Sequence, residues 1–270
     1  MEHTDFVHRV PPRPEYGQGL YIRSLAIVTP APGVVAAALE DSAHAFELEF
    51  THDQGIITSV RARWFRHPFT SCSGVEQTLA ANVGHPLGGH LLSVMKMSDR
   101  VQQCTHQYDL FCLAVTHAFH GREDRRYDVV ITDPVQGDLV PTTLYLNGQP
   151  VLEWLVKDYE QLVSPEHCRG VNTMKGFTSW VKANIPPEQH ELYFMAQRAW
   201  FVARTQKLDI ESMEGQPAPW SGPPAGNCHG TQPQRYASAV RTDNSMRRFT
   251  PGGNNATLAF FDHPMPPGAV

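Results

Sequence analysis

Basic residues form no long run in this sequence. Lysine and arginine stand at most in pairs, charged residues make up only 18% of the chain, and the formal net charge is −5. Proteins that bind nucleic acid usually carry a basic patch or stripe that neutralises phosphates. We therefore expect no nucleic-acid partner.

Cysteine is scarce, and its spacing shows no pairing. The five cysteines are Cys72, Cys104, Cys112, Cys168 and Cys228, with no Cys-x-x-Cys among them. An odd number of widely spaced cysteines favours reduced thiols and a cytoplasmic protein over a disulfide framework.

Long apolar runs are also missing. The longest, residues 25–39, is interrupted by Pro30, Pro32 and Gly33, and the N-terminal residues are polar. The sequence therefore predicts neither a membrane span nor a secretion signal.

Several enzyme signatures are absent. No Gly-x-Ser-x-Gly elbow and no His-Glu-x-x-His helix occurs, which argues against a serine hydrolase of that type and against a zincin. Residues 84–90 contain three glycines, but no Lys-Ser/Thr follows them. They favour a turn over a phosphate-binding loop.

The remaining pattern predicts an α+β fold with one main domain. Residues 1–19 are a Pro-rich N-terminal arm, residues 20–212 the α+β catalytic domain, and residues 213–270 an extended Pro/Gly-rich C-terminal tail. We expect an antiparallel sheet of about six strands packed against three to four helices. Residues 45–50 and 56–65 alternate apolar and polar side chains around a turn at Gln54-Gly55, which is typical of a half-buried hairpin.

A single helix over residues 101–121 is the centre of the predicted fold. Asp99 and Gln102 resemble a capping box at its start. At about 100° per residue, His106, Asp109 and His117 lie on one face of an otherwise apolar helix. Titratable groups on so apolar an element need partners, because burying them unpaired is costly.

His106, Asp109 and His117 are therefore the candidate catalytic residues. An imidazole three residues from a carboxylate can be oriented as a general acid or base. Two alternatives remain open for the same stripe. It can hold a metal, with ligands completed by other histidines, or it can be a buried hydrogen-bond network that only fixes the helix.

Candidate substrate-binding residues flank the helix. Arg61 and Arg63 share one face of a strand and Trp64 lies on the other, while Thr105 precedes His106. The arginines suit a phenolate or carboxylate, or else form a solvated face. Residues 227–230 of the tail are candidates to lie over an active site of the same or a second chain.

The central stretch resembles a known family. Cys104-Thr105-His106-x-x-Asp109-Leu110, followed by Gly176-Phe177-x-x-Trp180 and Arg198-Ala199-x-Phe201-Val202, is similar to a bacterial domain-of-unknown-function family with a Cys-Thr-His-Leu signature. The likeness covers roughly residues 20–207. Gln107 stands where the family usually has Leu, which predicts that this position is not fully buried.

Members of that family tend to accompany genes for aromatic-compound catabolism, and a looser resemblance is to the phenylcoumaran γ-formaldehyde lyases of lignin-dimer breakdown. The resemblance implies a cofactor-free, metal-free lyase that releases formaldehyde from a small aromatic substrate and leaves a stilbene. We expect a homodimer to which the C-terminal tail contributes. Two other functions stay open: a metal-dependent hydrolase or isomerase using His106, Asp109 and His117, and a non-catalytic ligand-binding or assembly protein.

Overall fold

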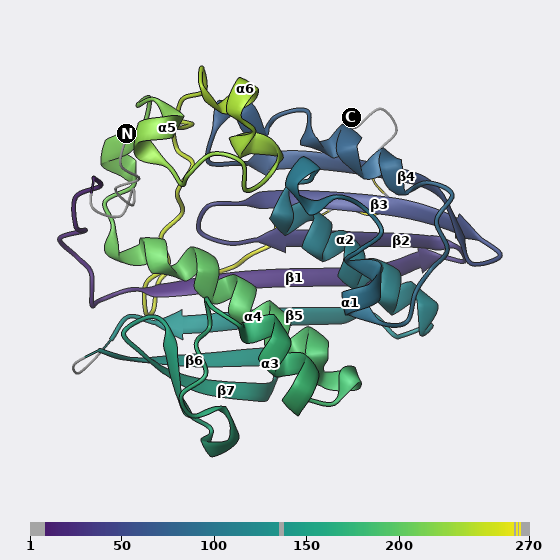
Figure 1. Cartoon of the computed structure of the whole chain (residues 1–270), viewed down its shortest axis with the longest axis horizontal. Helices are drawn as coiled ribbons and strands as arrows, with labels where there is room; N and C mark the ends of the chain where they lie inside the picture. Colours follow the sequence, from purple (N-terminus) through teal and green to yellow (C-terminus); the bar gives the residue numbers. More distant parts are fainter. Residues whose placement is uncertain (1–8, 135–137, 262, 264, 266–270) are drawn as a thin grey trace.

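An antiparallel sheet of eight strands forms the centre of the protein (Figure 1). The computed structural model describes residues 9–134, 138–261, 263 and 265. The strands lie side by side in the order β4-β3-β2-β1-β5-β6-β7-β8. Their bounds are β1 Leu20–Ala31, β2 Val34–Glu40, β3 Ala45–Asp53, β4 Ile56–Arg66, β5 Arg125–Thr132, β6 Leu139–Leu146, β7 Gln149–Lys157 and β8 Gln161–Ser164.

The predicted α+β class is confirmed, but the prediction of about six strands and three to four helices was too low. The described residues form eight strands and six α-helices. The missed elements are short: β8, α1, α5 and α6 have four residues each. Four residues are too few for a hydrophobic period to show in the sequence.

The alternation predicted for β3 and β4 is confirmed by how the strands pack. Phe46 pairs with Trp64 across the two strands; Phe46 belongs to the hydrophobic core under the helices, and the half-buried Trp64 packs against that core. Glu47 pairs with Arg63 on the opposite face, where their side chains form an ion pair. The period of two in a strand thus separates an apolar face from a charged face.

The two halves of the sheet have the same order of elements. Strands β1 to β4 precede the long helix α2 (Thr105–Phe119), and strands β5 to β8 precede α3 (Phe177–Asn184) and the long helix α4 (His190–Ala203). β1 and β5 pair antiparallel at the centre, so the halves are related by an approximate twofold rotation. The two long helices consequently lie over the middle of the sheet (Figure 1).

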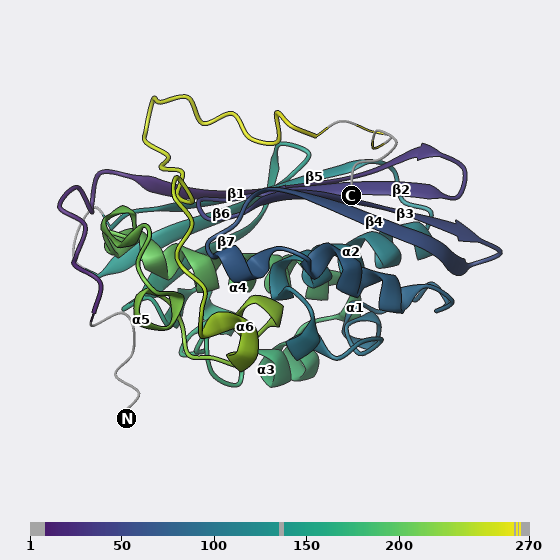
Figure 2. The same ribbon diagram turned by 90° about the horizontal axis from the view of Figure 1, so that it is seen from above.

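All helices cover one face of the sheet (Figure 2). The remaining α-helices are α1 Leu91–Val94, α5 Ala218–Ser221 and α6 Pro233–Tyr236. Short 3-10 helices fill the connections: Thr70–Cys72, Val75–Asn82, Arg100–Gln102, Glu166–Cys168, Pro187–Gln189, Arg204–Lys207, Glu211–Met213 and His229–Thr231. Within the described residues no helix is long and apolar enough to cross a lipid bilayer.

Helix α2 is shorter than the predicted helix over residues 101–121. Asp99 does not cap it. Instead, the Asp99 side chain accepts the amide of Val101 at the start of the preceding 3-10 helix, and α2 begins at Thr105. Residues 107–117 are all buried, Gln107 included. The prediction that Gln107 is not fully buried was therefore wrong, and its amide atoms have no partner among the described residues.

The C-terminal residues cover the other face of the sheet, where the yellow trace crosses the strands in Figure 2. Glu40 on β2 accepts the backbone amide of Leu258 at 2.7 Å and pairs with Arg247 at 2.6 Å. Further along, Phe65 on β4 contacts Phe260, with ring centroids 4.4 Å apart. The first two contacts add to the ion pair of Glu40 with Arg66 at 3.3 Å, so this buried carboxylate is fully partnered.

Residues 208–244 instead pack on the helix side. Their backbone joins the connection after β4, where Thr70 donates to the carbonyl of Val240 at 3.0 Å and Thr242 to that of Pro68 at 3.0 Å. They also join the segment before α2, where the amide of His229 donates to the carbonyl of Gln103 at 2.9 Å. The described residues from 208 to 265, which we call the C-terminal segment, thus pack on both faces of the sheet.

Candidate active site

A cavity of about 490 Å³ lies between the β2–β3 turn, the start of α2, the end of α4 and the C-terminal segment. We call it the main cavity. Its volume is typical of small-molecule sites, and Trp64, Phe69 and Phe201 supply aromatic wall. Nine lining residues come from the C-terminal segment: Leu208, Ile210, Pro223, Asn227, Cys228, Gly230, Thr231, Arg241 and Met246.

The turn between β2 and β3 holds a histidine against a buried carboxylate. Asp41 is fully buried, and its Oδ1 accepts the backbone amides of Ala43 and His44, both at 2.8 Å. The same oxygen lies 3.0 Å from His44 Nδ1. This is the local hydrogen bonding by which an aspartate shapes a turn. It orients the imidazole ring of His44 in the cavity wall.

Buried partners on β1 fix Asp41 from the other side. Tyr21 donates its hydroxyl to Oδ2 at 3.0 Å, and Arg23 Nη1 lies 3.5 Å from the same oxygen. Arg23 is only 2% exposed and also donates to the backbone carbonyl of Arg198 at 3.0 Å. The carboxylate is therefore paired and hydrogen-bonded, which is the condition for burying a charge.

His106 stacks on His44. The two rings have centroids 4.1 Å apart and planes 35° apart, although 61 residues separate them in the chain. His106 occupies the first turn of α2 and is half-buried. Both histidines line the main cavity. The sequence-predicted His106 thus has an imidazole partner that sequence reasoning missed.

Burial and neighbouring charge set the protonation of this group. Burial acts to raise the pKa of Asp41, but His44 and Arg23 outweigh it and hold that pKa well below its usual range. Burial lowers the pKa of His106 well below its usual value, and the nearby His44 and Arg23 lower it further. At neutral pH Asp41 is a carboxylate and His106 a neutral imidazole.

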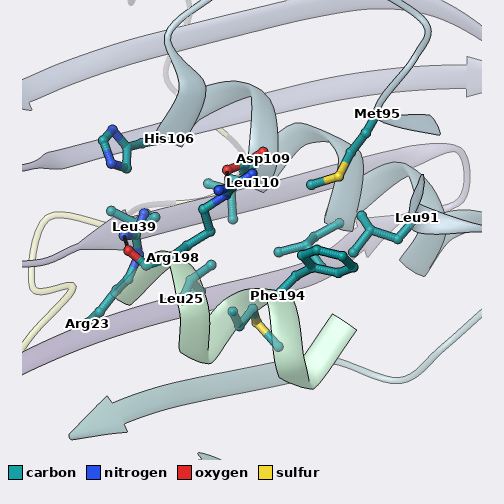
Figure 3. Close-up of a pocket in the computed structure, with 12 residues that line it drawn as sticks. Arg23, Leu25, Leu39, Leu91, Met95, His106, Asp109, Leu110, Phe194 and Arg198 are labelled. Atoms are coloured by element: carbon teal, nitrogen blue, oxygen red, sulfur yellow. Dashed lines mark hydrogen bonds and ion pairs between the residues drawn. The ribbon is translucent and has the colours of Figure 1, made fainter. Parts of the chain in front are cut away.

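Asp109 lies beside a second, much smaller cavity (Figure 3). That space measures about 20 Å³, which is room for little more than one water molecule. Arg198 extends from α4 toward Asp109, its Nε lying 2.7 Å from Oδ2, and Arg100 Nη2 lies 2.8 Å from Oδ1. His106 and Arg198 line both cavities and so stand between them.

His117 is not brought to either cavity. It is 1% exposed, and neither ring nitrogen has a hydrogen-bond partner among the described residues. Burial lowers the pKa of His117 to about 4, and Arg125 and Arg122 nearby contribute to this shift. The helical face predicted from the sequence is correct for His106 and Asp109, but His117 lies further along it, in the core.

The candidate substrate-binding residues separate into two groups. Thr105 and Trp64 line the main cavity. Arg61 and Arg63 lie on the far face of the sheet, where they pair with Glu49 at 2.5 Å and Glu47 at 2.7 Å. The structure therefore does not bring the two arginines together with the histidines.

Three thiols converge on the main cavity from separate segments: Cys72, Cys104 and Cys228. Burial raises the pKa of Cys72 to about 12 and that of Cys104 well above its usual value. These two thiols are protonated and weakly nucleophilic at neutral pH. Among the described residues no three His, Cys, Asp or Glu side chains are placed to hold a metal ion, the stripe of His106, Asp109 and His117 included.

Comparison with known proteins adds no relative. No model of a protein family matches the chain, and no curated protein matches its sequence. The resemblance to the Cys-Thr-His family therefore stays a prediction from the residues.

Proposed function

We propose that the protein is an enzyme that performs acid–base chemistry on a small aromatic compound bound in the main cavity. The observation that carries this proposal is the Asp41–His44 pair, stacked on His106 in the wall of a cavity of about 490 Å³. A histidine oriented by a buried carboxylate is a recurring arrangement for a general base. The aromatic wall residues Trp64, Phe69 and Phe201 favour a flat, apolar ligand.

His44 takes the role of base. In the neutral form of His44, a proton on Nδ1 makes the hydrogen bond to Asp41 and Nε2 keeps a lone pair, which can accept a proton from a molecule in the cavity. His106, a neutral imidazole, can donate one N–H to an oxygen that gains negative charge. Asp109 acts as a positioning residue, because it holds Arg100 and Arg198, which line the cavity.

The reaction that we propose is the formaldehyde release implied by the sequence resemblance. His44 takes the proton of the hydroxymethyl group, and the electrons of that O–H bond become the second bond of formaldehyde. The carbon–carbon bond then breaks and its pair forms the stilbene double bond. The ring ether C–O bond breaks with its electrons on the phenolic oxygen, which His106 stabilises before it takes up a proton. Atoms and electrons balance without a net oxidation.

The test is a formaldehyde-release assay with a racemic phenylcoumaran dimer, run with and without a chelator. We expect formaldehyde and a stilbene chromophore in equal amounts, unaffected by chelation. Loss of a general base typically costs about 10²- to 10⁴-fold in rate, and His44→Gln is expected to fall in that range. Asp41→Asn should lose activity and also stability, because buried Arg23 loses its counterion.

A matched control is His120→Gln. His120 is exposed at the end of α2, where its Nε2 lies 2.9 Å from the carbonyl oxygen of Gly89. Full activity in this variant shows that the loss in His44→Gln belongs to the cavity. Full activity in folded His44→Gln would show that His44 is not the general base. Absence of formaldehyde with every phenylcoumaran isomer would reject the proposed reaction, and turnover that a chelator abolishes would favour a metal enzyme.

A further inference from the structure

The main cavity has an uneven charge. Among its lining residues in the described part of the chain there is no aspartate or glutamate, whereas five cationic side chains are present: Arg100, Arg198, Arg204, Lys207 and Arg241. A cavity lined by one sign of charge with apolar walls concentrates ligands of the opposite sign. The composition alone therefore favours an anionic ligand.

Most of these cations already have partners. Arg100 and Arg198 both pair with Asp109, at 2.8 Å and 2.7 Å. Arg204 lies 3.9 Å from a carboxylate oxygen of Glu160. Lys207 stands over the ring of Tyr159, 5.3 Å from its centroid. Contacts within the protein therefore partly balance the positive charges of these four residues.

Arg241 is different. It is 4% exposed, whereas Lys207 is half-buried, and within the described residues neither forms an ion pair with a carboxylate. One terminal nitrogen, Nη2, donates to the carbonyl of Ser221, and the guanidinium carbon stands 4.7 Å from the ring centroid of Phe69. Its Nε is buried and has no hydrogen-bond partner among the described residues.

The two acidic side chains whose charge acts on Arg241, Glu211 and Glu214, have other partners. Glu211 pairs with Arg248, and Glu214 accepts the backbone amide of Asn244 at 2.8 Å. Burial lowers the pKa of Arg241 to about 10, which leaves it protonated at neutral pH. A buried, charged guanidinium without a counterion is costly, and a protein keeps such a group where something else supplies the charge.

We propose that Arg241 binds a carboxylate of the ligand that occupies the main cavity, which makes the ligand an aromatic carboxylate. This inference rests on the proposed function in one respect, that the cavity takes an aromatic compound. Guanidinium and carboxylate are planar and match in a two-point hydrogen bond. One unpaired arginine in an apolar wall balances one negative charge, which favours a carboxylate over a phosphate dianion.

The experiment compares two probes of nearly the same shape, stilbene-4-carboxylate and stilbene-4-carboxamide, which differ in charge and in the exchange of one carboxylate oxygen for an NH2 group. Their dissociation constants are measured by fluorescence titration at pH 7.5 with wild type, Arg241→Met, Arg241→Lys and the control Arg169→Met. Arg169 is 60% exposed and pairs with Glu166 at the surface, outside the cavity. A charge-assisted hydrogen bond is worth about 10- to 100-fold in affinity.

We expect wild type and Arg169→Met to bind the carboxylate about 10- to 100-fold more tightly than the amide. Arg241→Met should bind both probes equally, with amide affinity unchanged, and Arg241→Lys should keep part of the preference. If the Arg241 variants fail to fold, comparing the affinities of the two probes for wild type still shows whether the cavity prefers the carboxylate or the amide.

Three outcomes would overturn the inference. Equal binding of both probes by wild type rejects an anion site and leaves the proposed aromatic site intact. An undiminished preference in folded Arg241→Met places the anion at Arg100, Arg198 or another cation. Binding of neither probe by wild type would reject the aromatic site itself, and with it both the inference and the proposed function.

Discussion

Replacing His117 with leucine tests whether this histidine is a core residue or part of the site. Its ring nitrogens have no partner among the described residues, and it is 1% exposed. Burial lowers its pKa to about 4 in the folded protein, whereas a histidine in an unfolded chain has a pKa of about 6.5. Folding is therefore opposed whenever this ring takes up a proton.

The sign follows from the order of the two pKa values. Because the folded value is the lower one, the unfolded chain binds the proton more readily between about pH 6.5 and pH 4. The stability that neutral His117 contributes is complete above pH 6.5 and is lost as the pH falls toward 4. From pH 7.5 to pH 4.5 this group alone lowers the free energy of unfolding by about 2.5 kcal/mol, at about 1.4 kcal/mol per pKa unit.

Urea unfolding followed by tryptophan fluorescence measures this difference at the two pH values. Wild type and the His120→Gln control should lose about 2.5 kcal/mol more than His117→Leu on acidification. At pH 7.5 the leucine variant should be at least as stable as wild type, because two unpaired buried nitrogens are gone. Equal acid losses in wild type and His117→Leu would refute the assignment of a buried neutral ring, and abolished turnover in a folded His117→Leu would return His117 to the site.

Two further predictions concern groups outside the acid–base pair. Arg63→Met should leave turnover unchanged, because Arg63 lies across the sheet from the cavity. The substitution should lower the free energy of unfolding by about 2 kcal/mol, because buried Glu47 loses an ion pair. A loss of turnover in the folded variant would contradict this placement. Cys72, whose pKa burial raises to about 12, should react with iodoacetamide at pH 8 about a hundredfold more slowly than in the urea-unfolded chain. Mass spectrometry of timed samples measures both rates, and equal rates would contradict a buried neutral thiol.

The local periodicity of apolar residues predicted much of the fold. The alternation around Phe46 and Trp64 gave the hairpin of β3 and β4 and its two faces, because side-chain direction in a strand depends only on the neighbouring residues. The helical period likewise placed His106 and Asp109 on one side of α2. Four-residue elements such as β8 give no period, so the strand number came out too low.

The site itself was predicted only in part, because it depends on contacts between distant segments. His44 meets His106 across 61 residues, and nothing local to either states that their rings stack. One signal was present: Asp41, three residues before His44 between two apolar strands, is typical of an aspartate-shaped turn. The two faces of β4 were predicted correctly, but the pattern does not say which face meets the cavity. For that reason Arg61 and Arg63 were predicted to bind substrate, although they face the C-terminal residues on the other side of the sheet.

The main cavity is built from two parts of the fold, the sheet with its helices and the C-terminal segment. His44 lies in the β2–β3 turn and His106 in α2, whereas Arg241 belongs to a segment held by hydrogen bonds to residues 68–73 and 101–103. A ligand that contacts both parts binds only the folded, docked arrangement. By mass action such a ligand at 100 times its dissociation constant adds about 2.7 kcal/mol to the stability of that arrangement. On the proposed function, ligand binding and docking of this segment are coupled, because the chain beyond α4 supplies a wall of the main cavity and its buried Arg241.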